Sequence, residues 1–248
     1  MSRKPVFFSA GETNRGLVRE HNEDAFSIFT GKNLLVSAVA DGVSCQGHGA
    51  VASTLCCEVW HDCAEAADPG FEASPEKISS FLNETLQLAN RKILERNAAD
   101  RIEAETTLCA LCLAGDLIGI IHAGDSRAYR LRQGKLQLLT QDHTLAEKYF
   151  VEKGCFPRER EKYAGMIYRA VGASPELEGD LKVEKFEDGD RFLLCSDGLY
   201  RVVDFEEIEA ILDKNKTPAR AVDRLMRAGL LGGADDNLTV AVVDVKME

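Results

Sequence analysis

The sequence predicts an α+β fold in which two antiparallel sheets pack face to face and helices cover their outer faces. Apolar runs of strand length come in groups separated by short polar turns, and a pair of helical segments follows each main group. The strands do not alternate singly with helices, and the glycine fingerprint of a dinucleotide-binding fold is missing. Without an internal repeat or long linker, residues 1–248 are expected to form one domain.

The first half of the chain begins with strands, followed by two helices and a run of short strands. The apolar runs AFSIF and LLVSAVA precede a helical segment at 47–66. A second helix is expected to begin at Ser74-Pro75, with serine as the N-cap and proline in the first turn. Four strand-like runs between 106 and 140 follow, joined by short turns, and are expected to form a meander.

The second half begins with a polar, irregular stretch at 141–170, of the kind that often covers a site. The runs LKVEKF and RFLLCS are expected to form a hairpin across the turn at 187–189. One helix is then expected to open on a capping box formed by Asp204 and Glu207, and another on Thr217-Pro218. The chain closes on the strand-like run LTVAVVDV.

Composition and charge exclude several classes of protein. The net charge of −11 argues against a nucleic-acid partner, because phosphate backbones require a basic surface. No apolar run is long enough to span a membrane and the first residues lack a signal-peptide core, so a cytoplasmic monomer is expected. The eight cysteines are then expected to be reduced. Cys109 and Cys112 stand three apart in a predicted strand, so they face opposite sides and cannot share a metal.

Four acidic turns lie at the ends of strand-like runs. The turns at 22–24 and 235–237 precede their strands, whereas Asp41-Gly42 and Asp197-Gly198 follow theirs. In antiparallel pairing, the start of one strand lies beside the end of its neighbour, so all four segments are expected to bring carboxylates to one rim. Gathered carboxylates repel one another unless a cation joins them, and oxygen ligands suit Mg²⁺ or Mn²⁺. The sequence therefore predicts a metal-dependent hydrolase.

Other polar residues occur near these turns. Arg19 lies five residues before Asp24, and its planar guanidinium matches the geometry of a phosphate group. The turn at 124–127 is either a plain hairpin turn or a source of another carboxylate at the same rim. His48 and His143 follow acidic turns closely enough to approach the site, whereas His61 and His122 are expected to be ordinary structural residues. No pattern in the chain supports a covalent nucleophile.

These motifs, in this order, resemble those of the PPM family of metal-dependent protein serine/threonine phosphatases, also called PP2C, in its bacterial form. They span nearly the whole chain, and the ordered set is far more specific than any single motif. The matching segments are 19–24, 39–42, 106–108, 124–127, 141–143, 169–172, 194–199 and 236–240.

The resemblance implies an αββα four-layer sandwich, with two antiparallel sheets flanked by helix pairs and two Mn²⁺ or Mg²⁺ ions at one end of the sheets. It also implies the ligands of these ions. Asp41 bridges the two ions, the Gly42 carbonyl binds one of them, and Asp197 and Asp236 hold the other. Glu23 and Asp24 act mainly through bound water.

The resemblance also implies a phosphate-binding residue, a third metal ion and a substrate class. Arg19 binds the phosphate group, and Asp125 with Asp197 takes a third ion. The implied reaction is hydrolysis of phosphoserine and phosphothreonine in phosphorylated proteins by metal-activated water, opposing a kinase. Residues 143–168, called the flap below, influence substrate choice; Cys155 within it is expected to be an ordinary thiol, the alternative being one whose oxidation alters turnover.

One segment departs from the family pattern. Gln46 stands where bacterial relatives usually carry a histidine, and His48 lies two residues later, so the resemblance assigns no proton donor. Two alternatives also stay open. The chain could be another two-metal phosphohydrolase such as a nuclease, against which its negative charge argues, or a phosphoprotein-binding sensor without catalysis, against which its full ligand set argues.

Overall fold

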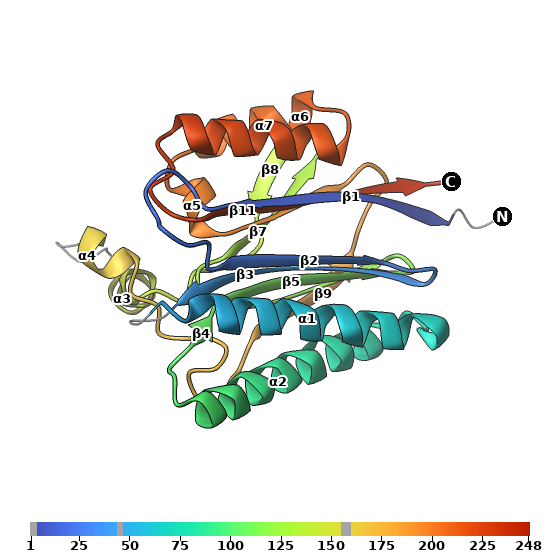
Figure 1. Cartoon of the computed structure of the whole chain (residues 1–248). Coiled ribbons are helices and arrows are strands. Elements are labelled where there is room, and N and C mark those ends of the chain that lie inside the picture. Colours follow the sequence, from blue (N-terminus) through green and yellow to red (C-terminus); the bar gives the residue numbers. More distant parts are fainter. Residues whose placement is uncertain (1–3, 44–46, 155–159) are drawn as a thin grey trace.

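The computed structural model describes residues 4–43, 47–154 and 160–248, and it forms a sandwich of four layers (Figure 1). Two antiparallel sheets pack against each other in the middle. Helices α1 (Gly49–Ala67) and α2 (Pro75–Asp100) cover the outer face of one sheet. Helices α6 (Phe205–Lys214) and α7 (Pro218–Leu231) cover the outer face of the other. The predicted fold class is confirmed.

The two sheets contain all the strands found in the described residues. The first sheet has the order β1-β11-β10-β7-β8, and the second has the order β2-β3-β5-β6-β9, with β4 paired to β3. The strands are β1 (Pro5–Asn14), β2 (Asp24–Thr30), β3 (Leu34–Val43), β4 (Glu105–Thr106), β5 (Leu108–Ala114), β6 (Leu117–Ala123), β7 (Arg127–Arg132), β8 (Lys135–Leu138), β9 (Asp180–Lys185), β10 (Arg191–Cys195) and β11 (Leu238–Met247).

The core lies in three apolar layers, one between the sheets and one beneath each helix pair. Alternation along β5 shows how a single strand serves two layers. Cys109 packs between the sheets, whereas Cys112 packs beneath α1 and α2. The prediction that these two thiols face opposite sides is therefore confirmed, and both are free.

Two predicted connections are wrong, because the chain changes sheets where a hairpin was expected. The expected meander is split, since β6 belongs to the second sheet and β7 to the first. LKVEKF and RFLLCS do not pair either, because β9 adds to β6 while β10 lies between β7 and β11. Phe186 and Phe192 both bury their rings between the sheets, so the segment joining them must cross the sandwich. Arg132 holds this crossing by pairing with the buried Asp190 at 2.6 Å.

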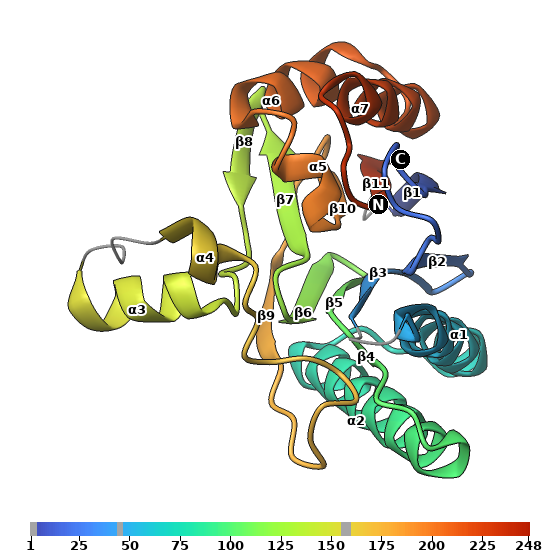
Figure 2. The same ribbon diagram turned by 60° about the vertical axis from the view of Figure 1, so that its left-hand side comes forward.

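Smaller differences concern the helix ends and the flap. Ser74 and Thr217 cap α2 and α7 as predicted, each accepting a backbone N–H bond. Asp204 begins α6 without a side-chain cap, so the expected capping box does not form. The stretch at 141–170 contains two helices, α3 (Leu145–Lys153) and α4 (Arg160–Ala164). They project from the sandwich beside β7 and β8 (Figure 2).

Two further short helices occur, the 3₁₀ helix η1 (Asp68–Gly70) and α5 (Asp197–Tyr200). Within the described ranges, we find no helix with the length and apolar character needed to cross a bilayer. The termini meet at one end of the sandwich, where Lys4 and Glu248 exchange backbone hydrogen bonds. The flap helices lie at the opposite end, near the start of α1 (Figure 1).

Close contact between α2 and β6 depends on Gly119. A methyl group at this position would lie 2.6 Å from Leu82 Cδ1 and also press on Ile78. Gly119→Ala is therefore expected to lower the free energy of unfolding by about 1–3 kcal/mol through overpacking. Thermal melting measures this as a loss of roughly 2–4 °C per kcal/mol. Gly70→Ala is the control, because that position faces open space; equal melting of both variants would contradict this account of the packing.

Candidate metal centre

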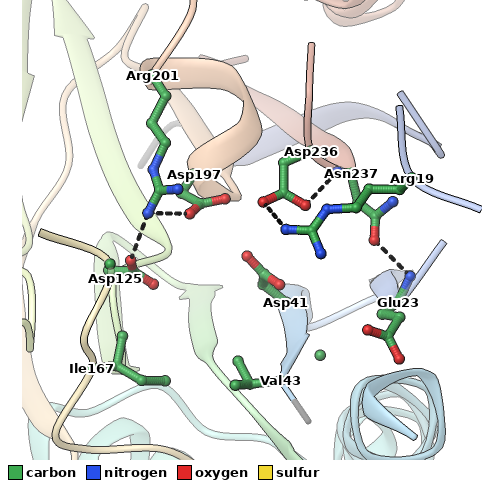
Figure 3. A pocket seen from close by; sticks show the side chains of 12 residues that line it. Arg19, Glu23, Asp41, Val43, Asp125, Ile167, Asp197, Arg201, Asp236 and Asn237 are labelled. Atoms are coloured by element: carbon green, nitrogen blue, oxygen red, sulfur yellow. Dashed lines mark hydrogen bonds and ion pairs between the residues drawn. The ribbon is translucent and has the colours of Figure 1, made fainter. Parts of the chain in front are cut away.

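A polar pocket of about 220 Å³ opens at one end of the sandwich, where segments from both sheets converge (Figure 3). Carboxylates from five parts of the chain face into it: the four acidic turns of the strand-end argument and the turn that carries Asp125. The pocket is lined by Arg19, Glu23, Asp41, Gly42, Val43, Asp125, Gly165, Ile167, Asp197, Arg201, Asp236 and Asn237.

The register of β2 and β3 places the first acidic turn beside the second. Asp24 begins β2 directly opposite Asp41 near the end of β3. The chain is close-packed here: Gly42 donates its N–H to the Glu23 carbonyl at 3.0 Å, and an added Cβ at Gly42 would lie 2.5 Å from the same oxygen. Only glycine fits at this approach. The Asp-Gly pattern thus marks a real steric constraint beside the pocket.

Two threonines hold the backbone of Asp41 in place. Thr107 Oγ1 accepts the Asp41 N–H at 3.0 Å, and the Asp41 carbonyl accepts bonds from Thr107 N–H at 2.8 Å and Thr106 Oγ1 at 2.9 Å. Thr107 Oγ1 also lies 2.7 Å from Ser126 Oγ, in the turn that carries Asp125. The motif at 106–108 therefore connects the backbone of Asp41 to the Asp125 turn.

Asp24 lies behind the pocket and does not line it. Its Oδ2 accepts hydrogen bonds at 2.7 Å from the hydroxyls of both Ser196 and Thr239. Glu23 does reach the pocket, and its Oε1 accepts the Gly49 N–H at 2.9 Å at the start of α1. Of the predicted ligands, Asp24 alone is thus placed one layer back from the pocket.

Asn237 ties the loops around the pocket together. Its side-chain oxygen accepts the Glu23 N–H at 2.8 Å, and its amide nitrogen donates to the carbonyls of Arg15 and His21 at 2.9 Å. The side chain is therefore fully engaged in holding the segment that carries Arg19 against the start of β11. Because Asp236 and Asn237 are consecutive, the carboxylate and this anchor lie at one rim.

The carboxylates in the pocket disfavour one another's ionised form. Burial, together with the charges of Asp24 and Asp197, raises the pKa of Asp41 well above its usual value of 3.8. Burial and the Asp197 charge raise the pKa of Asp125 to about 7. Asp197 is 6% exposed, its pKa is raised chiefly by burial, and its Oδ1 has no hydrogen-bond partner. Divalent cations would relieve this repulsion and satisfy the orphaned oxygen, so the donor set fits Mn²⁺ or Mg²⁺.

Two guanidinium groups face the same carboxylates (Figure 3). Arg19 Nη2 lies 2.7 Å from Asp236 Oδ2. Arg201 Nη2 lies 2.7 Å from Asp197 Oδ2 and 3.9 Å from Asp125 Oδ2. Sequence reasoning identified Arg19 but missed Arg201. The available signal was the spacing of four residues between Asp197 and Arg201, which places the two side chains on one side of a helical turn.

The turn that carries Asp125 is fixed from several sides. Gly124 adopts a φ of +110°, and a Cβ there would lie 2.7 Å from the Thr107 side chain, so glycine is required. The Gly124 N–H donates to His143 Nδ1 at 3.1 Å, and the His143 N–H donates to the Gly124 carbonyl at 2.9 Å. Tyr200 Oη donates to the Asp125 carbonyl at 2.9 Å. The carboxylate at position 125 is therefore held in place by its backbone.

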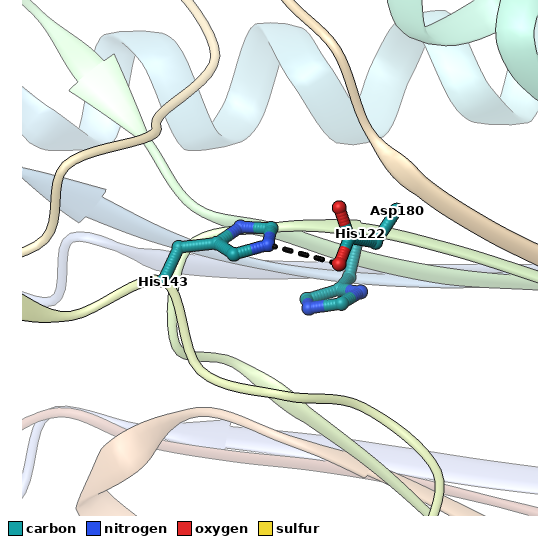
Figure 4. Close-up of side chains that lie close together, drawn as sticks. All are labelled: His122, His143 and Asp180. Atoms are coloured by element: carbon teal, nitrogen blue, oxygen red, sulfur yellow. Dashed lines mark ion pairs between the residues drawn. The ribbon is translucent and has the colours of Figure 1, made fainter. Parts of the chain in front are cut away.

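His143 supports this turn and does not line the pocket. It stacks on His122 with ring centroids 4.5 Å apart, and its Nε2 lies 3.4 Å from Asp180 Oδ2 (Figure 4). Nδ1 accepts the Gly124 N–H, and Nε2 lies near both Asp180 Oδ2 and Arg169 Nη1, which is 3.1 Å away. These three side chains could hold a metal by distance alone, but Arg169 already pairs with Asp180 at 2.6 Å. The cluster is thus a support for the Asp125 turn.

The other histidines considered from the sequence do not line the pocket either. His122 is buried and bonds the Gln141 carbonyl at 2.8 Å, and His61 packs its ring against Phe29 at 5.7 Å, so both are structural as expected. His48 precedes α1 and is not among the residues that line the pocket. Gln46 and Cys155 lie outside the described residues.

Comparisons with known proteins agree with the site's chemistry. The family model for protein phosphatase 2C matches residues 17–231. The serine/threonine phosphatase stp of Listeria monocytogenes is 32% identical over 94% of this chain and 93% of its own length. The serine/threonine protein phosphatase PstP of Mycobacterium tuberculosis is 35% identical over 95% of this chain, which spans 44% of that protein. A crystal structure of the PstP catalytic domain with two manganese ions superposes with a TM-score of 0.83 at 35% identity, covering 98% of this chain and 99% of that one.

Electrostatic repulsion in the pocket should reduce stability when no metal is bound. Because folding raises the Asp41 pKa above 3.8, the folded state binds more protons than the unfolded state, and the cost grows as pH rises above that value. Asp41→Asn is therefore expected to melt several degrees higher than wild type in EDTA at pH 8, with a smaller gain at pH 5.

In the same melting experiment, added Mn²⁺ should raise the melting temperature of wild type more than that of Asp41→Asn. Asp62→Asn, on the exposed face of α1, is the control. An Asp41→Asn protein that melts below wild type in EDTA at pH 8 would show that the carboxylate stabilises the metal-free fold.

Proposed function

We propose that this chain, which belongs to the protein phosphatase 2C (PPM) family, carries out its reaction in the pocket around Asp41, Asp197 and Asp236. The chain is a metal-dependent serine/threonine protein phosphatase. The observation that carries the assignment of the site is convergence: acidic residues from five separate parts of the sequence face one pocket, together with an arginine able to bind phosphate.

The pocket residues divide between two divalent ions. Asp41 stands centrally, between Asp197 and Asp236 on one side and Glu23 on the other (Figure 3), and is the candidate bridge. Asp197 and Asp236 hold one ion, and the Gly42 carbonyl binds the other. When bound, the ions supply positive charge that lowers the pKa of a water molecule and offsets charge on the phosphoryl oxygens. No residue of the pocket has to become phosphorylated.

The acidic residues at the edge of the pocket orient water around the ions. Glu23 has one carboxylate oxygen engaged by the Gly49 N–H, which fixes its direction at the pocket wall. Asp24 acts from behind, because Ser196 and Thr239 both donate to its Oδ2. Its other carboxylate oxygen is buried without a partner and is available for an ordered water. This arrangement suits the water-mediated role assigned to both residues.

Arg19 binds the phosphoryl group of the substrate. Its side chain is 54% exposed at the mouth of the pocket and pairs with Asp236 through one guanidinium nitrogen. No other contact within the described part of the chain engages the remaining N–H groups of the planar fork, which can bind phosphoryl oxygens bidentately. A metal ion that draws the Asp236 carboxylate to itself would release Arg19 further toward the substrate.

Asp125, with Asp197, takes a third ion. Both line the pocket, but Asp125 comes from the turn between β6 and β7, away from Asp41 and Asp236. Few protein oxygens are available there, so the third ion keeps most of its waters and binds more weakly than the first two.

The flap at 143–168 influences which phosphoproteins are accepted. Ile167 and Gly165 line the pocket wall, and within the flap α3 carries the exposed apolar side chains of Tyr149 and Val151. Substrates are phosphorylated by an opposing kinase. The chain acts as a monomer, since one chain supplies all the pocket residues, and works in the cytoplasm, where the six described cysteines stay reduced.

Strict dependence on the paired ions is the first expected outcome. Hydrolysis of a phosphothreonine peptide should cease in EDTA and return with Mn²⁺. Asp41→Asn and Asp236→Asn should each lower kcat/KM by about 100-fold or more, because each removes a ligand of the ions. Asp62→Asn should behave as wild type. Full turnover in excess chelator, or Mn²⁺-dependent cleavage of DNA in place of phosphopeptide, would defeat the assignment.

Loss of the phosphate contact is expected to act mainly on substrate binding. Arg19→Ala should raise KM for the phosphopeptide by about tenfold, and kcat should also fall if the contact tightens in the transition state. Arg19→Lys should recover only part of the loss, because lysine lacks the planar fork. Arg227→Ala, at an exposed ion pair on α7, is the control. Calorimetry that shows lost Mn²⁺ affinity in Arg19→Ala would mean that Arg19 organises the acidic residues instead.

A further inference from the structure

The guanidinium of Arg201 lies between the two carboxylates that would form the third metal site (Figure 3). Its Nη2 is 2.7 Å from Asp197 Oδ2, a charged hydrogen bond, and 3.9 Å from Asp125 Oδ2. Burial opposes the charge of this side chain, but the carboxylates of Asp197 and Asp125 raise the pKa of Arg201 above its ordinary value. A positive charge of the protein itself therefore stands where a cation is expected.

The local structure fixes this position. Arg201 follows α5, and its N–H donates to the Asp197 carbonyl at 3.1 Å, so the two side chains lie on one side of a single helical turn. The preceding residue, Tyr200, bonds the Asp125 carbonyl at 2.9 Å and stacks against the Arg127 guanidinium at 3.5 Å. Arg127 is in turn held by Asp142 at 2.7 Å. The backbone that carries Arg201 is thus attached to the Asp125 turn.

The oxygens of Asp197 are used unequally. Oδ2 is paired with Arg201, whereas Oδ1 is buried without any partner although the residue lines the pocket. Oδ1 is therefore available to an ion beside Asp236, while Oδ2 and the Asp125 carboxylate face the guanidinium. The contact with Asp125 is too long for a hydrogen bond, so that carboxylate is only partly neutralised.

We propose that Arg201 is a built-in counter-ion of the Asp125–Asp197 pair, which a divalent ion must displace in order to bind there. This inference rests on the third site of the proposed function. The guanidinium and the ion compete for the same oxygens, so Arg201 weakens the third site without affecting the first two. Its side chain is 41% exposed, which leaves it room to turn toward solvent when displaced. Arg19 pairs with a different carboxylate, so removing Arg201 leaves that contact in place.

Direct measurement of Mn²⁺ binding tests the competition without relying on activity. Free Mn²⁺ is titrated by electron paramagnetic resonance, with calorimetry in parallel, for wild type, Arg201→Gln and Arg201→Lys. Arg201→Gln keeps most of the side-chain length but removes the charge, so its weak class of sites should tighten by about tenfold or more. Arg201→Lys should stay near wild type, because its ammonium can still compete. The two tight sites should be equal in all three proteins.

Two further variants make the test specific. Asp125→Asn/Arg201→Gln should lose the gain, because the tightened site requires the Asp125 carboxylate, whereas Arg227→Gln should not differ from wild type. A weak class that is the same in wild type and Arg201→Gln, or absent from both, would overturn the proposal. These outcomes leave the proposed function standing as long as the two tight ions and phosphopeptide hydrolysis are present; loss of those in wild type would instead refute the function itself.

Discussion

Repulsion among buried carboxylates is the constraint on which the architecture of this pocket depends. Asp41, Asp125 and Asp197 all carry raised pKa values because each is desolvated and faces the charge of another. Left alone, such groups would move apart or take up protons. The protein holds the backbones of Asp41 and Asp125 in place through hydrogen bonds from the Thr106 and Tyr200 hydroxyls, and this preserves the arrangement that metal ions require.

Arginine side chains neutralise only part of the negative charge in the pocket. Two arginines pair with Asp236 and Asp197, but no guanidinium of the described residues pairs with Asp41, and one oxygen of Asp197 has no partner. If side chains neutralised every carboxylate, a metal ion would gain little electrostatic stabilisation by binding in the pocket. The pocket therefore combines enough positive charge to permit folding with enough unbalanced negative charge to bind cations.

Much of this site could be predicted from the sequence because its determinants are local. An apolar run ending in Asp-Gly indicates a strand end and a close backbone contact, and antiparallel pairing then places Asp24 opposite Asp41. Which strand pairs with which cannot be predicted from the residues of one strand alone. The runs on either side of Asp125 look like one meander, and only the packing of two sheets decides that β6 and β7 separate. Arg201 was missed for a related reason: α5 is so short that a single four-residue spacing, from Asp197 to Arg201, is all that marks the turn in the sequence.

The change of sheets at residues 124–126 has a mechanical consequence. Asp41 belongs to the second sheet, Asp197 and Asp236 adjoin strands of the first, and Asp125 lies on the chain that passes between them. The distances among these oxygens are therefore set by how the two sheets slide along each other. A substitution in the layer between the sheets, at Val39 or Phe192 for instance, would shift one sheet relative to the other without replacing a metal-binding residue. Misalignment of the sandwich would thus disturb metal geometry before it disturbed the fold.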